Sequence, residues 1–419
     1  MFQLAIIADD LTGSMDTGVQ FAKRGLRTVV SLVDRLAAGV FGGADVLVLN
    51  TNSRQDSPEE AGRKVLACGR YVRELGVRRA YKKIDSTLRG NIGAELDALL
   101  DAWGVPTALM TPAFPAVGRS VVGGLLLVNG VPWERTQYAP PGAATSCVAD
   151  VVGSRRLAAS VELAEVSRGE DTLAARLREL AGRGAGIIVA DAADAADLGV
   201  IARALAGAGL DQVICGSGGL AEELPAALGI VSGQTVGRIA RAVPNKPVLV
   251  VAGTVNPVTI QQVRHAQKTL APRVVEILPA SLARDPAVQR SRLEQACQES
   301  LDEGRDLLIA TVPLSASPET SLQERNSAVA EALGPVVAEA VARHQWSGLV
   351  MTGGDTAISL CEALGANALE IEGEVEPGVP CGRLLQGPLA GLLVVTKAGG
   401  FGSPEAIAKA ITFIRGRIK

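Results

Sequence analysis

The sequence predicts an α/β fold of two domains, each a mainly parallel sheet flanked by helices, with a cleft between the domains. Short apolar runs alternate with longer amphipathic stretches along almost the whole chain, which is typical of parallel strands joined by helices. The chain has 419 residues, enough for two domains of about 100–200 residues each. It is 47% hydrophobic and 20% charged, so each domain has the apolar side chains that a full core requires.

Short apolar runs are expected to form the buried strands. In the first half of the chain these runs are residues 4–8, 46–50, 79–84, 107–111, 186–190 and 212–215. In the second half they are residues 247–252, 307–312, 348–351 and 392–396. Helical patterns lie between the runs, for example over residues 58–75 and 92–103.

A basic segment with two prolines, residues 237–247, precedes the first strand of the second half. It predicts a domain boundary near residue 240, so that the domains span residues 1–240 and 241–419. Residues 128–144 are rich in proline and glycine and predict a long surface loop or hairpin. A loop of this length in a compact domain is either a lid or binding loop, or an excursion without a function.

Composition and charge argue against several classes of function. The formal net charge is −3 and no basic run is present, so no nucleic-acid partner is expected. The six cysteines lie far apart without a CxxC pair, which argues against a disulfide framework or a zinc site. No run approaches the ~18–20 apolar residues that cross a membrane, and no basic leader precedes the first strand. We expect a cytoplasmic protein without a membrane partner, for which a homo-oligomer is possible.

Two adjacent carboxylates, Asp9 and Asp10, follow the first predicted strand. Ligands of open α/β sheets bind at the carboxyl ends of the strands, so this turn is well placed for chemistry. Asp10 is suited to take the proton from an attacking hydroxyl group. Thr12 and Ser14 are suited to cap the following helix. In the alternative interpretation, the two aspartates only cap and order the turn.

A second group of polar residues, Lys83, Asp85, Ser86 and Arg89, lies between the strand at 79–84 and the helix at 92–103. Arginine holds a carboxylate or phosphate through a bidentate fork, and lysine supplies a point charge. The loop therefore predicts a site for a polyhydroxylated anion, with Asn91 as the cap of the next helix. A solvated charged loop is the alternative.

Two weaker signals lie in the same half. Arg54 follows the strand at 46–50 and brings another guanidinium to a strand end. Residues 216–221 (GSGGLA) match the G-x-G-x-x-A dinucleotide fingerprint after a strand, but the acidic residue expected about 20 positions later is absent. A tight turn that offers backbone N–H groups to a substrate fits this segment better.

Three strand–glycine-turn–helix units occupy residues 252–257, 352–357 and 397–404. Glycine lets the backbone approach a ligand, and helix N-termini favour phosphate, so three such turns in one domain predict a nucleotide-binding face. Each turn alone is a common connection. Asp355 is suited to hold Mg²⁺ directly or through water, or to cap its own helix. The chain has no Walker A motif and no protein-kinase catalytic loop.

Taken together, these residues resemble the four-carbon acid sugar kinase family, whose members phosphorylate threonate, erythronate and related tetronates. Five segments in family order carry the resemblance: ADDLTGSMD (8–16), KIDSTLRGN (83–91), GSGGLA (216–221), TGGDTA (352–357) and KAGGFG (397–402). The 3-oxo-tetronate kinases usually have a loop of the type CSTFDST in place of KIDSTLRG. The chain therefore looks more like the threonate and erythronate branch.

The resemblance implies an ATP-dependent kinase that phosphorylates threonate or erythronate at the terminal hydroxyl group, O4. It also implies an N-terminal domain for the sugar acid and a C-terminal domain for ATP and Mg²⁺. The implied substrate-binding residues are Asp10, Arg54, Lys83, Asp85, Ser86 and Arg89. We also expect Asp9 in this site and Asp10 as the catalytic residue. The implied ATP-binding residues are Thr254, Gly353, Gly354, Asp355, Gly399 and Gly400. Among them, Asp355 is the residue that we expect to hold Mg²⁺.

Other functions compete with this interpretation. A 3-oxo-tetronate 4-kinase, or a kinase of another small hydroxy acid, would use the same kind of site. A NAD(P)-dependent hydroxy-acid dehydrogenase would rest on residues 216–221, and a thermal-shift comparison of NADH with ATP would distinguish it. A sugar-acid sensor of two domains would bind the acid without turning over ATP.

Overall fold

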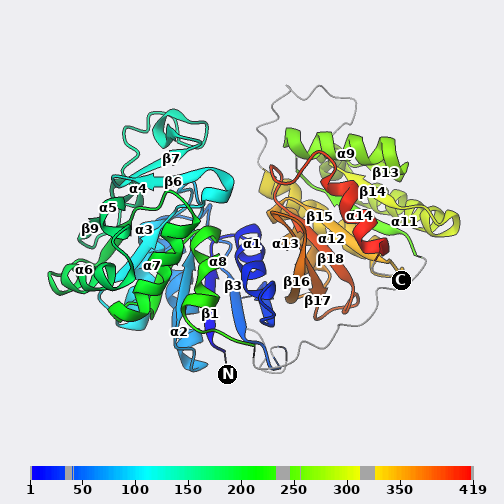
Figure 1. Ribbon diagram of the computed structural model, residues 1–419. Helices are drawn as coiled ribbons and strands as arrows, with labels where there is room; N and C mark the ends of the chain where they lie inside the picture. The colour runs from blue at the N-terminus through cyan, green and yellow to red at the C-terminus, as the bar shows by residue number, and fades with distance from the viewer. Residues whose placement is uncertain are drawn as a thin grey trace. The chain divides into compact units, whose positions relative to one another are not determined.

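The computed structural model describes residues 2–33, 40, 42–232, 246–254, 256–311 and 326–416. The chain forms two compact units, one of residues 1–29 and 33–236 and the other of residues 30–32 and 237–419. Each unit is a sheet of mainly parallel strands flanked by helices (Figure 1). The predicted α/β class is therefore confirmed. The predicted boundary near residue 240 lies outside the described residues and stays a prediction.

The first unit contains a sheet with the strand order β3-β1-β4-β11-β5-β10-β9, in which all neighbours are parallel. Its strands are β1 (Leu4–Ala8), β3 (Val46–Asn50), β4 (Ala80–Lys83), β5 (Ala108–Thr111), β9 (Ala158–Val161), β10 (Ile187–Ala190) and β11 (Val213–Gly216). A further short strand, β2 (Thr28–Ser31), lies between β1 and β3 in the sequence. Most of these strands are apolar and buried along their whole length, as expected of a sheet with both faces covered.

Helices cover the two faces of this sheet. Helix α2 (Pro58–Glu74) packs on α3 (Ile92–Trp103), while α1 (Leu11–Ala22), α8 (Gly218–Ala227), α7 (Ala195–Ala208) and α6 (Glu170–Gly182) pack one against the next (Figure 1). The remaining helices are α4 (Val148–Val152) and α5 (Leu163–Val166). The bounds of β1, β3 and α3 agree with the sequence prediction to the residue.

The proline- and glycine-rich stretch is part of a small separate sheet. Strands β6 (Arg119–Val122), β7 (Leu125–Val128) and β8 (Val131–Pro132) form an antiparallel meander, followed by a single 3₁₀ turn at Trp133–Arg135. The prediction of a loop or hairpin found the turn residues. It missed β6, which begins with Arg-Ser and has no long apolar run, and also β7, whose short apolar run Leu-Leu-Leu-Val was not predicted as a strand.

The second unit contains the strand order β13-β14-β12-β15-β18-β17-β16. The strands β12 (Val248–Ala252), β13 (Arg273–Glu276), β14 (Leu307–Ala310), β15 (Gly348–Thr352) and β18 (Leu393–Lys397) are parallel, whereas β17 (Val379–Leu384) runs antiparallel to both β18 and β16 (Ala368–Glu376). This hairpin was not predicted, because its outer strand carries alternating glutamates rather than an apolar run.

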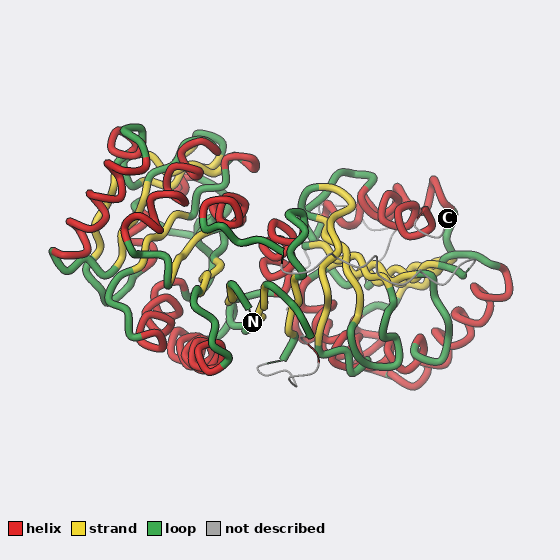
Figure 2. Tube along the Cα trace, turned by 60° about the horizontal axis from the view of Figure 1, so that its bottom comes forward, coloured by secondary structure: helices red, strands yellow, loops and turns green. Residues whose placement is uncertain are grey.

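Helices also lie on both faces of the second sheet (Figure 2). Helices α9 (Pro257–Leu270) and α14 (Ala406–Gly416) pack together, and their apolar side chains form one core with β12, β15 and β18. Helices α11 (Pro286–Glu303), α12 (Asn326–Val341) and α13 (Gly354–Ala363) form another packed row, to which the short α10 (Pro279–Arg284) adds. Among the described residues, no helix is long and apolar enough to cross a membrane.

The register of both sheets brings the predicted functional turns to one edge. In the first unit, the last residue of β1, Ala8, pairs with Asn50 of β3 and with Lys83 of β4. In the second unit, Thr352 of β15 pairs with Ala252 of β12 and with Lys397 of β18. Because parallel strands end at the same side of a sheet, the turns that follow these strands are neighbours.

Candidate active site

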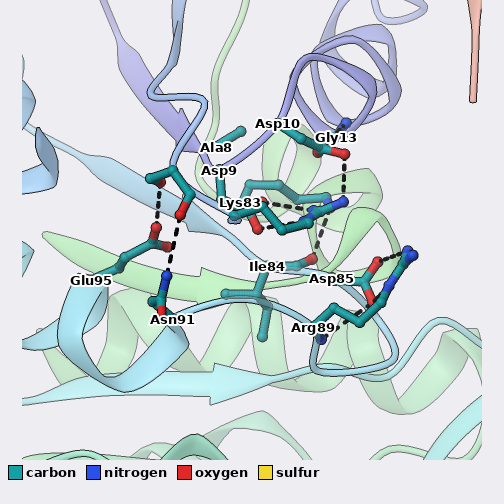
Figure 3. A network of polar contacts seen from close by, with 12 residues as sticks. Ala8, Asp9, Asp10, Gly13, Lys83, Ile84, Asp85, Arg89, Asn91 and Glu95 are labelled. Atoms are coloured by element: carbon teal, nitrogen blue, oxygen red, sulfur yellow. Dashed lines mark hydrogen bonds and ion pairs between the residues drawn. The ribbon is translucent and has the colours of Figure 1, made fainter. Parts of the chain in front are cut away.

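Charged side chains gather where β3, β1 and β4 end (Figure 3). Asp9 and Asp10 follow β1, Arg54 lies four residues after β3, and Lys83 is the last residue of β4. The sequence predicted these residues from separate segments, and the strand order β3-β1-β4 brings them together.

Asp9 holds Arg54 through both carboxylate oxygens. Arg54 Nε donates to Asp9 Oδ2 (2.7 Å) and Nη2 donates to Oδ1 (2.8 Å), which is the bidentate geometry of a strong pair. Burial raises the pKa of Asp9, but the Arg54 guanidinium more than offsets this, and the net pKa lies below the usual value. Asp9 is 2% exposed, so its place is beneath the surface of the site, where it orients Arg54.

Asp10 is the N-cap of α1. Its Oδ1 accepts the backbone N–H of Gly13 (2.8 Å), and its Oδ2 accepts Arg54 Nη1 (2.5 Å). Thr12 and Ser14 were predicted to cap this helix, and that prediction is wrong. Asp10 is the cap, and Ser14 Oγ donates to the Asp10 carbonyl oxygen (2.9 Å). Capping leaves the Asp10 side chain 23% exposed at the surface of the site.

The pKa of Asp10 lies above its usual value. Burial is the largest cause, and the neighbouring Asp9 carboxylate adds to it, against the opposing effect of Arg54. The pKa values of the two adjacent carboxylates that share Arg54 are thus shifted in opposite directions, and Asp10 binds a proton more readily than Asp9. A carboxylate with a raised pKa is better matched to proton transfer near neutral pH.

Lys83 and Ser86 carry polar groups that the described residues leave largely available. The Lys83 ammonium is buried beside Asp10 and Gly13 (Figure 3), and its one hydrogen bond within the described part of the chain is to the Ile84 carbonyl oxygen (2.8 Å). The half-buried Ser86 side chain makes no hydrogen bond to the described residues. An ammonium group has three donors, so Lys83 can contact an anion or several hydroxyl groups.

Asp85 and Arg89 form the second bidentate pair of the site. Arg89 Nε donates to Asp85 Oδ2 (2.9 Å) and Nη2 to Oδ1 (2.8 Å), while Thr87 also donates its hydroxyl to Asp85 Oδ2. Burial acts to raise the pKa of Asp85, but its bonds to Arg89 hold that pKa well below the usual range. The Arg89 side chain is 52% exposed, whereas that of Arg54 is 15% exposed. Arg89 is thus the more accessible guanidinium for an incoming carboxylate.

Beneath this surface lies a buried ion pair that the sequence analysis missed. Lys82 Nζ lies 2.9 Å from Glu95 Oε2, with the two side chains 0% and 1% exposed, and Ser53 Oγ donates to Glu95 Oε1 (2.5 Å). Burial lowers the pKa of Lys82, but Glu95 and Asp9 outweigh it and raise the net pKa. A signal was present: consecutive lysines in a strand point to opposite faces, so one of the two must lie under a helix.

The small antiparallel sheet is tied to the loop of residues 84–91 by one side chain. Trp133 is 4% exposed, and its indole Nε1 donates to the Thr87 carbonyl oxygen (2.8 Å). The next residue, Leu88, has a left-handed backbone (φ 60°), which is uncommon for a residue with a branched side chain. Asn91 stands at the start of α3 but caps it with no side-chain bond; its Nδ2 instead donates to Ser53 and Asp56 carbonyl oxygens (3.2 and 2.9 Å).

The dinucleotide-like turn at residues 216–219 is filled by protein atoms. A Cβ at Gly216 would lie 2.6 Å from the Tyr81 hydroxyl, and one at Gly219 would lie 2.7 Å from the Ala113 carbonyl oxygen. The Tyr81 hydroxyl donates to Ser217 O (2.5 Å), and the Ser217 hydroxyl donates to Ala113 O (2.6 Å). These glycines therefore permit close packing of α8 on the sheet.

In the second unit, the three glycine turns converge around two threonines. A Cβ at Gly253 would lie 1.9 Å from Thr356 Oγ1, and one at Gly399 would lie 2.8 Å from Thr254 Oγ1. The backbone N–H of Gly353 donates to the Lys397 carbonyl oxygen (3.0 Å). The predicted residues Thr254, Gly353, Gly354, Gly399 and Gly400 therefore come from neighbouring turns at one edge of the sheet.

Asp355 lies in the first turn of α13, and its side chain is exposed. The N-cap position of this helix is Gly353, which has no side-chain cap, so Asp355 does not fill the alternative role of N-cap residue. Within the described part of the chain, no group of three or more His, Cys, Asp or Glu side chains could hold a metal ion. A metal at this edge would be held by one carboxylate together with a ligand and water.

Two family models match the chain in succession. The sugar-binding N-terminal domain matches residues 4–224, and the nucleotide-binding C-terminal domain matches residues 249–407. The D-threonate kinase of Salmonella typhimurium is 37% identical, over 98% of both chains. The D-erythronate kinase of Heliobacterium modesticaldum is 32% identical over 100% of this chain and 98% of its own. The 3-oxo-tetronate kinase of Methylobacterium radiotolerans is 32% identical over 97% and 98%, respectively.

Solved structures share the architecture. A Salmonella typhimurium chain superposes with a TM-score of 0.81 at 23% identity, over 98% of each chain. The Haemophilus influenzae protein HI1011 superposes with a TM-score of 0.76 at 23% identity, over 98% of this chain and 100% of its own. At these identities the two structures establish the fold alone.

Proposed function

Because this chain belongs to the four-carbon acid sugar kinase family, we propose that it transfers the γ-phosphoryl group of ATP to a four-carbon sugar acid, threonate or erythronate, at the terminal hydroxyl O4. The observation that carries the proposal is the cluster of Asp10, Lys83 and Arg89 at adjacent strand ends, where a hydroxylated anion would meet a base and two cations. The relatives named threonate and erythronate kinases support this substrate class.

Arg89 is the residue proposed to hold the carboxylate of the sugar acid. Its guanidinium group is more exposed than that of Arg54, and its ion pair with the Asp85 carboxylate holds it in place. Arg54 is clamped by Asp9 and Asp10, so its proposed contribution is positive charge and a fixed place for Asp10. Lys83 and Ser86 would hydrogen-bond to the hydroxyl groups of the substrate.

Asp10 is proposed to act as the base. As the bond between O4 and the γ-phosphorus forms, the O4 proton moves to the Asp10 carboxylate, and the bond between that phosphorus and the bridging oxygen of ADP breaks. Positioning and charge stabilisation account for most of the rate enhancement in such transfers, and general-base catalysis contributes typically ~10²–10⁴-fold. The raised pKa of Asp10, which burial and Asp9 cause, suits this role.

ATP is proposed to bind at the three turns of the second unit. Thr254 would offer its hydroxyl group, and the turns with Gly353, Gly354, Gly399 and Gly400 would offer backbone N–H groups, as helix N-termini do for phosphates. Mg²⁺ binds through one or two carboxylates while keeping several waters, and the single exposed Asp355 in the first turn of α13 fits this preference. The ion would neutralise charge on the phosphates.

The test is ADP release by the full chain with ATP and each of D- and L-threonate, D- and L-erythronate and the 3-oxo-tetronates. Strong turnover of one threonate or erythronate is expected, with a KM for the acid that rises by roughly 30-fold or more in Arg89→Ala, since a desolvated ion pair contributes ~2–5 kcal/mol. The KM for ATP should stay unchanged. Turnover of a 3-oxo-tetronate alone would favour the alternative substrate, which the relative of that name supports. Turnover of none would refute the proposal.

A further inference from the structure

Lys397 is the last residue of β18 and lies at the base of the turn that carries Gly399 and Gly400. The residue is 3% exposed. Its Nζ donates to the Ala398 carbonyl oxygen (2.7 Å), the Thr259 hydroxyl (3.1 Å) and the Gly399 carbonyl oxygen (3.4 Å). The Thr259 hydroxyl in turn donates to Gly399 O (2.7 Å). A buried ammonium is therefore held at this turn by acceptors that carry no charge.

In the described part of the chain, no carboxylate forms an ion pair with this ammonium. Among the described residues, no carboxylate oxygen lies within the 4.0 Å ion-pair distance of Lys397 Nζ. Glu376 attracts the ammonium electrostatically from a greater distance. Its carboxylate oxygens instead accept hydrogen bonds from Ser403 N (2.6 Å) and Lys409 Nζ (2.8 Å). Burying an ion costs several kcal/mol unless an opposite charge compensates. Burial lowers the pKa of Lys397 to about 8, against the opposing effect of Glu376.

The position of Lys397 indicates which anion could balance it. Lys397 pairs in register with Thr352, its carbonyl oxygen accepts the N–H of Gly353 (3.0 Å), and its turn packs on Thr254. All three proposed ATP-binding turns thus lie next to it. Resting on the proposed function, we propose that the Lys397 ammonium binds oxygens of the β- and γ-phosphates of ATP and stabilises the charge that develops during transfer.

The chemistry asks little of the side chain beyond its charge. Lys397 stays protonated and forms no covalent bond; it exchanges hydrogen bonds to the Ala398 and Gly399 carbonyls for bonds to phosphate oxygens. As the bond from the γ-phosphorus to the bridging oxygen breaks, negative charge grows on the β-phosphate of ADP. A compact cation with three rotatable donors at that place favours the transition state.

The experiment measures the affinity of the full chain for MgATP and MgADP by calorimetry. The affinity for adenosine is measured by its displacement of bound MgADP. The variants are Lys397→Met, Lys397→Arg and the control Lys268→Met, which removes an exposed lysine from the last turn of α9. We expect Lys397→Met to weaken MgATP and MgADP by about 10- to 100-fold with adenosine unchanged, Lys397→Arg to weaken them less, and Lys268→Met to match the wild type.

Two outcomes of that experiment would overturn the proposal. Unchanged affinity of Lys397→Met for MgATP would show that the ammonium does not meet the phosphates. An equal loss for adenosine would show that Lys397 only supports the turn. Neither outcome depends on turnover of a sugar acid, so the result is separate from the test of the proposed function.

The wild type provides a second measurement that needs no variant to fold. Phosphate binding should raise the pKa of Lys397, so at pH 9 the protein should take up close to one proton per MgATP bound, and at pH 7 far less. The charged groups on the surrounding elements are Asp355 of α13, Glu376 of β16 and Lys409 of α14, while α9 presents the uncharged Thr259 and Gln262. The ion pair between Glu376 and Lys409 lowers the pKa of Glu376 and raises that of Lys409, so both pKa values move away from the range of pH 7 to 9. Calorimetry in buffers of different ionisation enthalpy measures the uptake, and its absence at pH 9 would refute the proposal.

Discussion

The strand ends of the two units carry different chemical groups. In the first unit, three aspartates, one glutamate, two arginines and two lysines lie within a few hydrogen bonds of one another, and nearly every charge has a partner of the opposite sign. In the second unit, the turns around Thr254 are glycine backbone and hydroxyl groups, and the buried Lys397 has neutral acceptors.

The difference corresponds to what each edge is proposed to bind. A sugar acid offers hydroxyl groups and one carboxylate, which side chains must distinguish individually. The phosphates of a nucleotide bring several negative charges of their own, so backbone N–H groups and an unbalanced cation suffice for them. Lys82 and Lys397 are both buried lysines in strands, and the presence or absence of a carboxylate separates their roles.

The largest expected effect is that of Asp10→Asn, which should lower kcat by about 10²–10⁴-fold. Asparagine can still cap α1 at Gly13, so the ATP affinity and the free energy of unfolding should change little. Because the base must be deprotonated and its pKa is raised by burial and Asp9, wild-type kcat should fall in acid at a pH above the usual ~3.9 for Asp. Steady-state rates at several pH values test this, and a fully active Asp10→Asn enzyme would contradict the assignment.

Glu95→Gln should lower the free energy of unfolding by about 3–5 kcal/mol, because Lys82 would stay buried without its counter-charge. Urea unfolding of the variant provides the measurement. The matched control is Glu60→Gln, which breaks an exposed pair with Arg63 and should leave the free energy of unfolding nearly unchanged. Equal stability of the two variants would mean that Lys82 is not held by charge.

The charge of Lys397 should lower the free energy of unfolding, whereas the charge of Glu95 raises it. Its folded pKa is lowered to about 8 by burial, while the unfolded pKa stays near 10.5, so between these values the unfolded state binds more protons. Wild-type stability should therefore rise with pH relative to that of Lys397→Met, by roughly 2 kcal/mol from pH 8 to 9.5. Urea unfolding at both pH values measures this difference, and a fall with pH would contradict the lowered pKa.

The smallest expected effect is that of Trp133→Phe, which keeps an aromatic ring but removes the bond to Thr87 O. Loss of one hydrogen bond of ~1 kcal/mol should raise the KM for the sugar acid by about fivefold while the KM for ATP is unchanged. Trp103→Phe is the control, because the buried Trp103 indole N–H has no hydrogen-bond partner among the described residues. If both variants raise the KM alike, the tether does not position the loop.

The order of strands and helices was predictable because parallel strands buried on both faces appear as continuous apolar runs. Several strands with a weaker signature were missed, among them the glutamate-bearing β16 and the short β6, and the short apolar β7 was missed as well. The family and its kind of site were also predictable, since Asp10, Lys83 and Arg89 follow strands in recognisable motifs.

The pairings within the site were not predictable from the sequence. Both adjacent carboxylates bind Arg54, but no local pattern records that Asp9 forms the bidentate pair while Asp10 accepts one bond and caps α1. The Lys82–Glu95 bond joins a strand to a helix that begins nine residues after the strand ends, so only packing fixes its geometry.

The glycine contacts of the second unit have a consequence for how the protein can change over generations. Gly253 and Gly399 face Thr356 and Thr254 so closely that any side chain would collide, whereas the Arg89 side chain is 52% exposed. Substitutions at these two glycines of the proposed ATP-binding turns are therefore sterically blocked, whereas the exposed Arg89 can be exchanged without a collision. A saturation library should accordingly recover few folded variants at Gly253 and Gly399 and many at Arg89.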